Sequence, residues 1–302
     1  MHKEIKWPKK TREMQTSMID STYWNDFEFR DDDIIVGTYQ KAGTTWVQQI
    51  IAQFVFNGET EGMPVGDISP WLDLRLPPLE AKLPDIIAQK HRRFLKTHLP
   101  VDAFVYEPKA KYIYIARDGR DIVWSLFNHH HALNDVFYDG IASLPNFGPL
   151  LPRPETEDVR EYFLAWLAGD GHPFWPFWEN IRTWWETRNL PNMYFLHFQN
   201  LVDDLEGTMR KIAAFLDIPI DESKWDTILH HCSFDYMKAN ATAAVPLGGA
   251  FWDGGAEQFI HKGVNGRWRD TLSDVEVGKY ENLADAELGE ECAQWLATGK
   301  MP

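Results

Sequence analysis

Short β-prone runs alternate with helix-like runs along most of the chain, and this alternation constrains the fold more than any other feature. Strands separated by helices build βαβ units, in which helices cover both faces of a parallel sheet. We therefore expect an α/β fold of three layers, with a central parallel sheet flanked by helices. The expected strands are 34–39, 94–97, 111–116 and 193–198, and the expected helices are 44–56, 118–130, 157–167 and 201–216.

Two ranges lack this regular pattern. Residues 134–171 contain several prolines, and residues 243–266 are rich in glycine, so we expect both to be largely irregular apart from the helix at 157–167. Long irregular segments in a compact domain are usually lids or binding loops, although plain surface excursions remain the alternative.

Composition limits the class of protein. The 302 residues carry 30 Lys and Arg against 45 Asp and Glu, a formal charge of −15, while 44% are hydrophobic and 14% aromatic. So many apolar residues exclude a disordered chain, and the acidic balance argues against nucleic acid as a partner. No repeat or long linker divides the chain, so we expect a single domain over 1–302. Any basic site must then be a local pocket.

The cysteine content and the hydropathy pattern indicate a location. Two cysteines, Cys232 and Cys292, are too few for a disulfide framework and fit a reducing compartment. The first ten residues are charged and have no apolar core, and the apolar range 46–56 is too short to span a bilayer. We expect a cytoplasmic protein without a membrane span.

The first candidate site is the turn between the strand 34–39 and the helix that follows it. Gly43 would let the backbone curl around an anion, Thr44 and Thr45 add hydroxyl donors, and Lys41 adds a charge. A Walker A motif has its lysine directly after the second glycine, whereas Lys41 precedes Gly43. The turn therefore predicts phosphate binding without the lysine placement of an ordinary ATPase. A plain strand–helix turn is the alternative.

The second candidate site follows the strand 111–116. Arg117 lies at the carboxyl end of that strand, where open α/β sheets bind ligands, and Ser125 lies eight residues later on the next helix. A guanidinium group matches phosphate oxygens, so both side chains could meet one anion. A surface pair between Arg117 and Asp121 is the alternative.

These segments resemble four motifs of the cytosolic-type sulfotransferase family, in the family's order. Residues 37–46 resemble its 5′-phosphosulfate loop, the Arg117–Ser125 segment its 3′-phosphate motif, Lys96-Thr97-His98-Leu99-Pro100 its K-T-H-L-P sequence, and 262–268 its K-G-x-x-G-x-W segment. The similarity covers about residues 30–270. It implies a P-loop-like fold and a sulfation reaction in which 3′-phosphoadenosine 5′-phosphosulfate (PAPS) donates its sulfuryl group and leaves as PAP. The acceptor would be a small hydroxylated, hydrophobic molecule, and no metal would be required.

The resemblance also implies roles for individual residues. His98 would be the general base, Lys41 would stabilise the bridging oxygen of the leaving nucleotide, and Lys96 would neutralise the sulfuryl oxygens. Ser125 would interact with Lys41 before the acceptor binds. The implied cofactor-binding residues are Lys41, Gly43, Thr44, Thr45, Trp46, Arg117, Ser125, Phe234, Met237, His261, Lys262 and Gly263.

Five positions depart from the family pattern. Gln40 replaces a usual Pro, Ala42 a Ser, Phe198 a Tyr, Cys232 a Thr, and His261 an Arg. A neutral His261 would weaken the hold on the 3′-phosphate, whereas a protonated one would keep part of it.

Several alternatives stay open. The competing functions are a P-loop-type kinase and a nucleotide-binding protein without sulfotransfer. The run 129–131 ends a helix, where histidines suit the dipole, and one of the three could line the acceptor pocket. We expect the acceptor pocket to draw on Phe137, Tyr138, Phe147 and Phe251, and the aromatic residues of 174–185 to be mostly helix core. The acceptor and the oligomeric state are not specified by the sequence.

Overall fold

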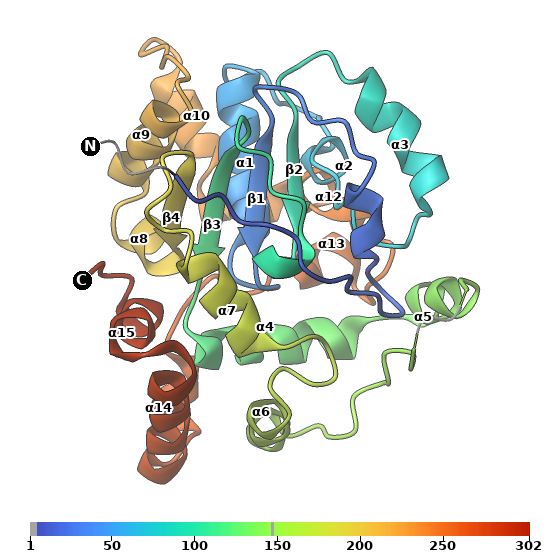
Figure 1. The fold of residues 1–302 in the computed structure, drawn as a ribbon, viewed down its shortest axis with the longest axis vertical. Coiled ribbons are helices and arrows are strands. Elements are labelled where there is room, and N and C mark those ends of the chain that lie inside the picture. The colour runs from blue at the N-terminus through green and yellow to red at the C-terminus, as the bar shows by residue number, and fades with distance from the viewer. Residues whose placement is uncertain (1–4, 146–147) are drawn as a thin grey trace.

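A four-stranded parallel sheet forms the centre of the molecule (Figure 1), with the strand order β2-β1-β3-β4. The computed structural model describes residues 5–145 and 148–302. The strands are β1 (Ile34–Thr38), β2 (Phe94–Thr97), β3 (Lys111–Ala116) and β4 (Met193–His197). The predicted α/β class and parallel sheet are confirmed.

Helices surround the sheet. The α-helices are α1 (Thr44–Val55), α2 (Val65–Ile68), α3 (Leu79–Ala88), α4 (Gly119–Ala132), α5 (Asp135–Ala142), α6 (Val159–Ala168), α7 (Phe177–Trp185), α8 (Phe198–Asp203), α9 (Leu205–Phe215), α10 (Trp225–His231), α11 (Phe234–Ala239), α12 (Ala241–Ala244), α13 (Gly255–Phe259), α14 (Asp274–Leu288) and α15 (Glu290–Thr298). Short 3₁₀ turns are η1 (Ser21–Trp24), η2 (Val101–Ala103), η3 (Pro246–Gly249) and η4 (Arg267–Asp270). Among the described residues, no helix has both the length and the apolar content that crossing a membrane requires.

The two faces of the sheet pack against different helices, because successive residues of a strand point to opposite sides. Ile35 and Tyr114 join a cluster with Trp184 of α7 and with apolar side chains of α14 and α15. Ile34 and Val36 join a second cluster with residues of α1, α9 and α10. Both faces are therefore buried, as a parallel sheet with crossover helices requires.

The structure corrects three of the expected helical and irregular ranges. The helix expected at 201–216 is two helices, because Asp204 leaves helical geometry (φ −149°, ψ 79°) and its carboxylate accepts the Gly207 N–H at the start of α9. The range 134–171 contains α5, where the Asn134 side chain accepts the Phe137 N–H. The range 243–266 contains η3 and α13. Side-chain caps, which carry no hydrophobic period, mark the starts of α9 and α5, whereas η3 and α13 begin without one.

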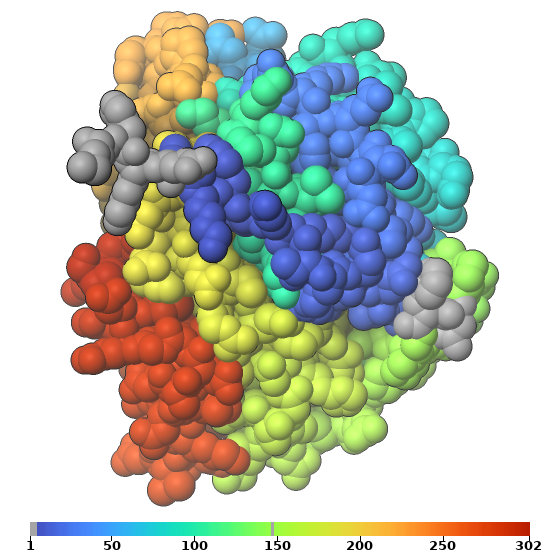
Figure 2. All heavy atoms as spheres, in the orientation of Figure 1, coloured from blue at the N-terminus to red at the C-terminus, as the bar shows by residue number. Residues whose placement is uncertain are grey.

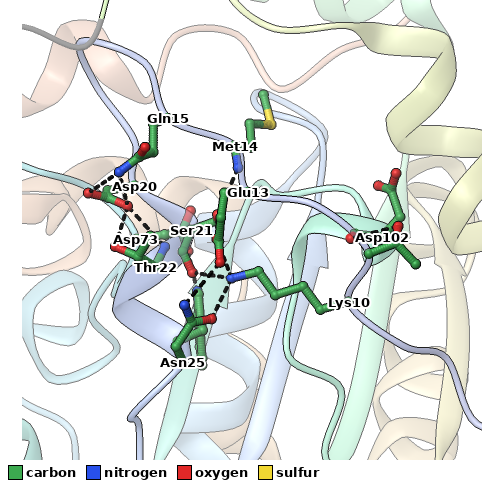
Figure 3. A network of polar contacts seen from close by, with 12 residues as sticks. Lys10, Glu13, Met14, Gln15, Asp20, Ser21, Thr22, Asn25, Asp73 and Asp102 are labelled. Atoms are coloured by element: carbon green, nitrogen blue, oxygen red, sulfur yellow. Dashed lines mark hydrogen bonds and ion pairs between the residues drawn. The ribbon is translucent and has the colours of Figure 1, made fainter.

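The N-terminal segment, residues 5–30, runs in dark blue across the face of the molecule that Figure 2 shows, before the chain enters β1. The Thr11 N–H donates to the carbonyl of Asp102 at 2.8 Å, and Arg12 pairs with the Asp102 carboxylate at the same distance. Further along, the N–H of Asp20 donates to the carbonyl of Asp73, within the polar network of Figure 3. The segment is thus hydrogen-bonded to η2, which follows β2, and to the loop between α2 and α3.

Candidate active site

The carboxyl ends of the four strands supply the centre of the site. Thr38 ends β1, and His98, Arg117 and Phe198 each follow the last residue of a strand. Parallel strands end at the same edge of a sheet, which is where open α/β folds bind ligands. The sequence spacing therefore brings these three side chains to one cavity.

The turn after β1 is shaped for an anion. Gly43, the N-cap of α1, has φ 115°, and a Cβ there would lie 2.9 Å from both Ile115 Cδ1 and Phe198 Cδ2. Only glycine fits this position, because it needs both a left-handed backbone and a close approach. No side chain caps α1, so the first N–H groups of the helix are available to a ligand.

One open cavity collects every catalytic and cofactor-binding residue that the sequence predicts. The predicted residues that line it are Lys41, Gly43, Thr44, Thr45, Trp46, Lys96, His98, Arg117, Ser125, Phe234, Met237, His261, Lys262 and Gly263. The acidic chain therefore does concentrate its expected cations in a single cleft.

His98 is held in one tautomer. Its Nδ1 lies 2.8 Å from the carbonyl oxygen of Thr38, and since a carbonyl can only accept, Nδ1 carries the proton and Nε2 does not. The ring is 5% exposed, and burial, with help from the charge of Lys96, lowers the pKa of His98 to about 3. The imidazole is therefore neutral, with an unprotonated nitrogen at the cavity.

Two tryptophan side chains pack against the ring of His98. The ring of Trp71 meets it edge-on at 4.5 Å, and Trp175 stacks on it at 5.7 Å. The indole N–H of Trp71 donates to Asp73 Oδ2 at 2.8 Å, and Trp24 donates to the other oxygen of that carboxylate at 3.0 Å. The polar network of Figure 3 therefore continues through Asp73 to the surroundings of His98. Trp175, predicted as helix core, precedes α7 but is buried in the main core cluster, from which it supports His98.

Two lysines of the cavity, Lys41 and Lys96, have lowered pKa values. Burial lowers the pKa of Lys41 to about 7, and the charges of Arg117 and Lys96 add to this effect. Burial also lowers the pKa of Lys96 to about 8, with Asp73 opposing the shift. Cations crowded in this way favour an anionic ligand, whose charge would restore both pKa values.

The expected contact of Lys41 with Ser125 is wrong for this structure. Within the described residues no hydrogen bond joins the two side chains; Lys41 Nζ lies 3.4 Å from Nδ1 of His129 and 3.8 Å from the ring centre of Phe259. His129 is four residues after Ser125 on α4 and so shares its face of the helix. Of the run 129–131, His129 is the histidine that lines the cavity.

Arg117 forms the far end of the cationic cleft. Its Nε donates to Asn265 Oδ1 at 2.7 Å and one terminal nitrogen donates to the carbonyl of Val264 at 3.0 Å, while the guanidinium lies 4.2 Å from the ring centre of Phe198. The alternative surface pair does not form, because Asp121 Oδ1 accepts the Gly266 N–H at 2.6 Å and no ion pair links Asp121 to Arg117 in the described residues. Arg117 thus ties the sheet edge to the segment 262–266.

The other end of the cavity is apolar. Phe137 and Phe251 line it as predicted, but Tyr138 does not, because neighbouring residues of a helix point about 100° apart. Instead the Tyr138 ring lies 4.3 Å from the guanidinium carbon of Arg153. Phe147 lies outside the described residues. Further apolar lining comes from Met18, Trp71, Leu74, Leu76, Leu133, Pro246, Trp252, Phe259 and Ile260.

Sequence reasoning missed several lining residues. Arg267 stands at a variable position inside the recognised segment 262–268, so only its charge could have drawn attention. Met18 and Trp252 come from segments without a motif, and nothing in the sequence pointed to them. Across residues 5–145 and 148–302, no group of three or more His, Cys, Asp or Glu is placed to hold a metal ion.

Comparison with known families places the chain. The sulfotransferase domain family matches residues 31–291, which is most of the sequence. The chain belongs to this family. The membership confirms the predicted enzyme class, a PAPS-dependent sulfotransferase.

Individual relatives agree with that class. The glycolipid sulfotransferase Rv1373 of Mycobacterium tuberculosis (strain ATCC 25618 / H37Rv) is 27% identical over 310 residues, which cover 94% of this chain and 93% of the relative. Sulfotransferase 1B1 of Mus musculus is 29% identical over 265 residues, or 85% and 82% of the two chains.

Solved structures share the fold. Mouse sulfotransferase SULT7A1, complexed with PAP, superposes with a TM-score of 0.69 at 23% identity and covers 91% of each chain. Retinol dehydratase, in complex with androsterone and PAP, gives a TM-score of 0.70 at 23% identity over 90% of this chain and 87% of its own.

Proposed function

We propose that this protein transfers the sulfuryl group of PAPS to the hydroxyl of a small, largely apolar acceptor, with His98 as the general base. The observation that carries the proposal is the hydrogen bond from His98 Nδ1 to the Thr38 carbonyl. It leaves Nε2 as a proton acceptor at the junction of a cationic cleft and an apolar chamber.

The cationic half of the cavity suits the nucleotide. PAPS carries phosphate groups at its 3′ and 5′ positions, and the cleft offers Lys41, Arg117, Lys262 and the free N–H groups at the start of α1. Phe234 and Met237 of α11 would enclose the adenine, and Trp46 is fixed by its indole N–H bond to the carbonyl of Cys232 at 2.7 Å.

Proton transfer is the task assigned to His98. As the acceptor oxygen attacks sulfur, its hydroxyl proton moves to Nε2, and the imidazolium that forms keeps its Nδ1–H bond to Thr38. The low pKa of His98 in the free protein keeps the base unprotonated, and the negative charge of the bound sulfuryl group would stabilise the imidazolium.

The leaving nucleotide develops negative charge on its bridging oxygen as the S–O bond breaks. Lys41 would stabilise this charge, and Lys96 would neutralise the sulfuryl oxygens from the neighbouring strand end. Ser125 would contact the nucleotide from the same face of α4 as His129.

The acceptor chamber favours a molecule with a large apolar body. Its wall is built mostly from Leu, Phe and Trp side chains, with few polar groups beyond His98 and His129. Such a wall stabilises apolar surface and leaves a hydroxyl at His98 as the polar contact. A sterol-like alcohol or a lipid fits this description better than a charged acceptor. Two free, buried cysteines also lead us to propose a cytoplasmic location.

A sulfation assay with labelled PAPS and a panel of hydroxylated acceptors tests the reaction. His98→Gln should reduce kcat/KM by about 10²- to 10⁴-fold, the usual contribution of a general base, without changing PAP affinity. His230→Gln, at an exposed histidine of α10, is the matched control. Near wild-type sulfation by His98→Gln would refute the base assignment. Stabilisation by ATP·Mg²⁺ in preference to PAP would favour a kinase or another nucleotide-binding function.

A further inference from the structure

Arg267 is a cation with no protein counterpart in the part of the chain that the structure describes. The residue is half-buried and lines the cavity, yet no ion pair or hydrogen bond involves its guanidinium, and its Nε is fully shielded from solvent. Burial of an unpaired charge and donor costs several kcal/mol, so such groups are normally matched. Arg93 and Arg120, which are also buried, each have a carboxylate within 2.6 Å.

The surroundings of Arg267 are predominantly positive. Burial lowers the pKa of Arg267, and only the charge of Asp121 opposes this. Arg267 in turn contributes to the lowered pKa of Arg117 and, after burial, is the largest charge acting on His261. The Asp121 carboxylate is already engaged by the Gly266 N–H. The missing partner of this cluster is therefore an anion from outside the chain.

The local backbone fixes the position of Arg267. Gly266 has φ 82° and is the N-cap of η4, in which the ring centre of Trp268 lies 4.0 Å from the guanidinium carbon of Arg120 and 4.5 Å from that of Arg269. Arg269 is exposed and does not line the cavity, whereas Arg267, two residues earlier, does. Of the two arginines on this turn, only Arg267 lines the cavity.

We propose that Arg267 binds the 3′-phosphate of the nucleotide and supplies, from a different backbone position, the positive charge that His261 lacks. The inference rests on the proposed function, since it assumes that PAPS occupies the cationic cleft. Arg117 and Lys262, at the same end of the cavity, would share this phosphate with Arg267. Two of the phosphate oxygens can then be met by the planar guanidinium fork.

Calorimetric titration of Arg267→Met with PAP and with 5′-AMP, which lacks the 3′-phosphate, tests the assignment. Methionine keeps the apolar stem and removes the charge. We expect PAP affinity to fall by about 10- to 100-fold, the range for a charge-assisted hydrogen bond, and 5′-AMP affinity to change less than about twofold. Arg267→Lys should recover part of the loss. Arg269→Met, on the same turn, should bind both nucleotides as the wild-type protein does.

The outcomes distinguish a wrong role for Arg267 from a wrong nucleotide. If the wild-type protein prefers PAP over 5′-AMP but Arg267→Met binds PAP equally well, the role of Arg267 is refuted while the proposed function stands. Equal losses for the two nucleotides also refute it, because the effect would then not depend on the 3′-phosphate. If the wild-type protein does not prefer PAP, the nucleotide itself is wrong and the assignment falls with it.

Discussion

Binding of PAP should draw protons from solution, because the cleft holds two lysines that are partly deprotonated near neutral pH. The pKa of Lys41 is lowered to about 7 and that of Lys96 to about 8 by burial and, for Lys41, by neighbouring cations. An anionic nucleotide favours the charged form of both lysines and raises their pKa values. Between the free and the bound pKa values, each lysine takes up a proton as PAP binds.

The magnitude follows from these two values. At pH 8 the free protein holds about 0.1 proton on Lys41 and about 0.5 on Lys96, so full protonation in the complex means an uptake of about 1.4 protons. At pH 6 both lysines are already charged, and the uptake falls to about 0.1 proton. PAP affinity should therefore decline as pH rises from 6 to 9.

Isothermal titration calorimetry in two buffers of different ionisation enthalpy measures this uptake directly. Lys41→Met should reduce the uptake at pH 8 to about 0.5 proton, because only Lys96 then contributes. Lys211→Met, at an exposed lysine of α9, should leave it unchanged. A wild-type uptake near zero at pH 8, or the same uptake in Lys41→Met, would show that the cleft does not depress these pKa values.

Three further predictions concern stability and are checked by equilibrium unfolding. Gly37→Ala should lower the free energy of unfolding by about 1–3 kcal/mol, because the new Cβ would lie 2.6 Å from a ring carbon of the fully buried Trp184. An unchanged free energy of unfolding would show that the indole has room to move. Asp33→Ala should lower the free energy of unfolding by about 3–5 kcal/mol, since Arg93, which is 2% exposed, loses its carboxylate partner at 2.5 Å. Adding Arg93→Met to this variant should recover part of the loss, and no recovery would contradict the reasoning. Burial lowers the pKa of His197 to about 4, so the unfolded chain binds a proton below pH 6.5 that the native state does not. This histidine should account for about 3 kcal/mol of the stability lost between pH 6.5 and 4, beside the losses from the other buried histidines, and His197→Gln should lose that much less; an equal loss in the variant would refute it.

The parts of the structure that local sequence encodes were predictable. β2 and β3 have the expected bounds, and β1 and β4 differ by one residue, because each strand is a short apolar run. The cavity residues from Lys41 to Gly263 were found through short motifs, several of which directly follow a strand. In both cases a few neighbouring residues carry the whole signal.

What the sequence did not reveal depends on contacts between distant segments. The support of His98 by Trp71 and Asp73 requires the N-terminal segment, and the orientation of Lys41 toward His129 depends on how α4 is rotated. Arg267 occupies a variable position of a known motif, and only its burial without a partner distinguishes it. None of these contacts leaves a periodicity or a composition in the sequence from which it could be predicted.

The N-terminal segment has a consequence for how enzymes of this kind diverge. Met18 lines the cavity, although the family match begins only at residue 31, and the same segment reaches Trp71 through Asp73. The wall of the proposed acceptor chamber is thus assembled partly from a stretch of chain that precedes the matched family domain. We therefore expect exchanges in this stretch to change which alcohol is accepted while the phosphate-binding turns stay as they are. Residues before the first strand would then set acceptor choice separately from nucleotide binding.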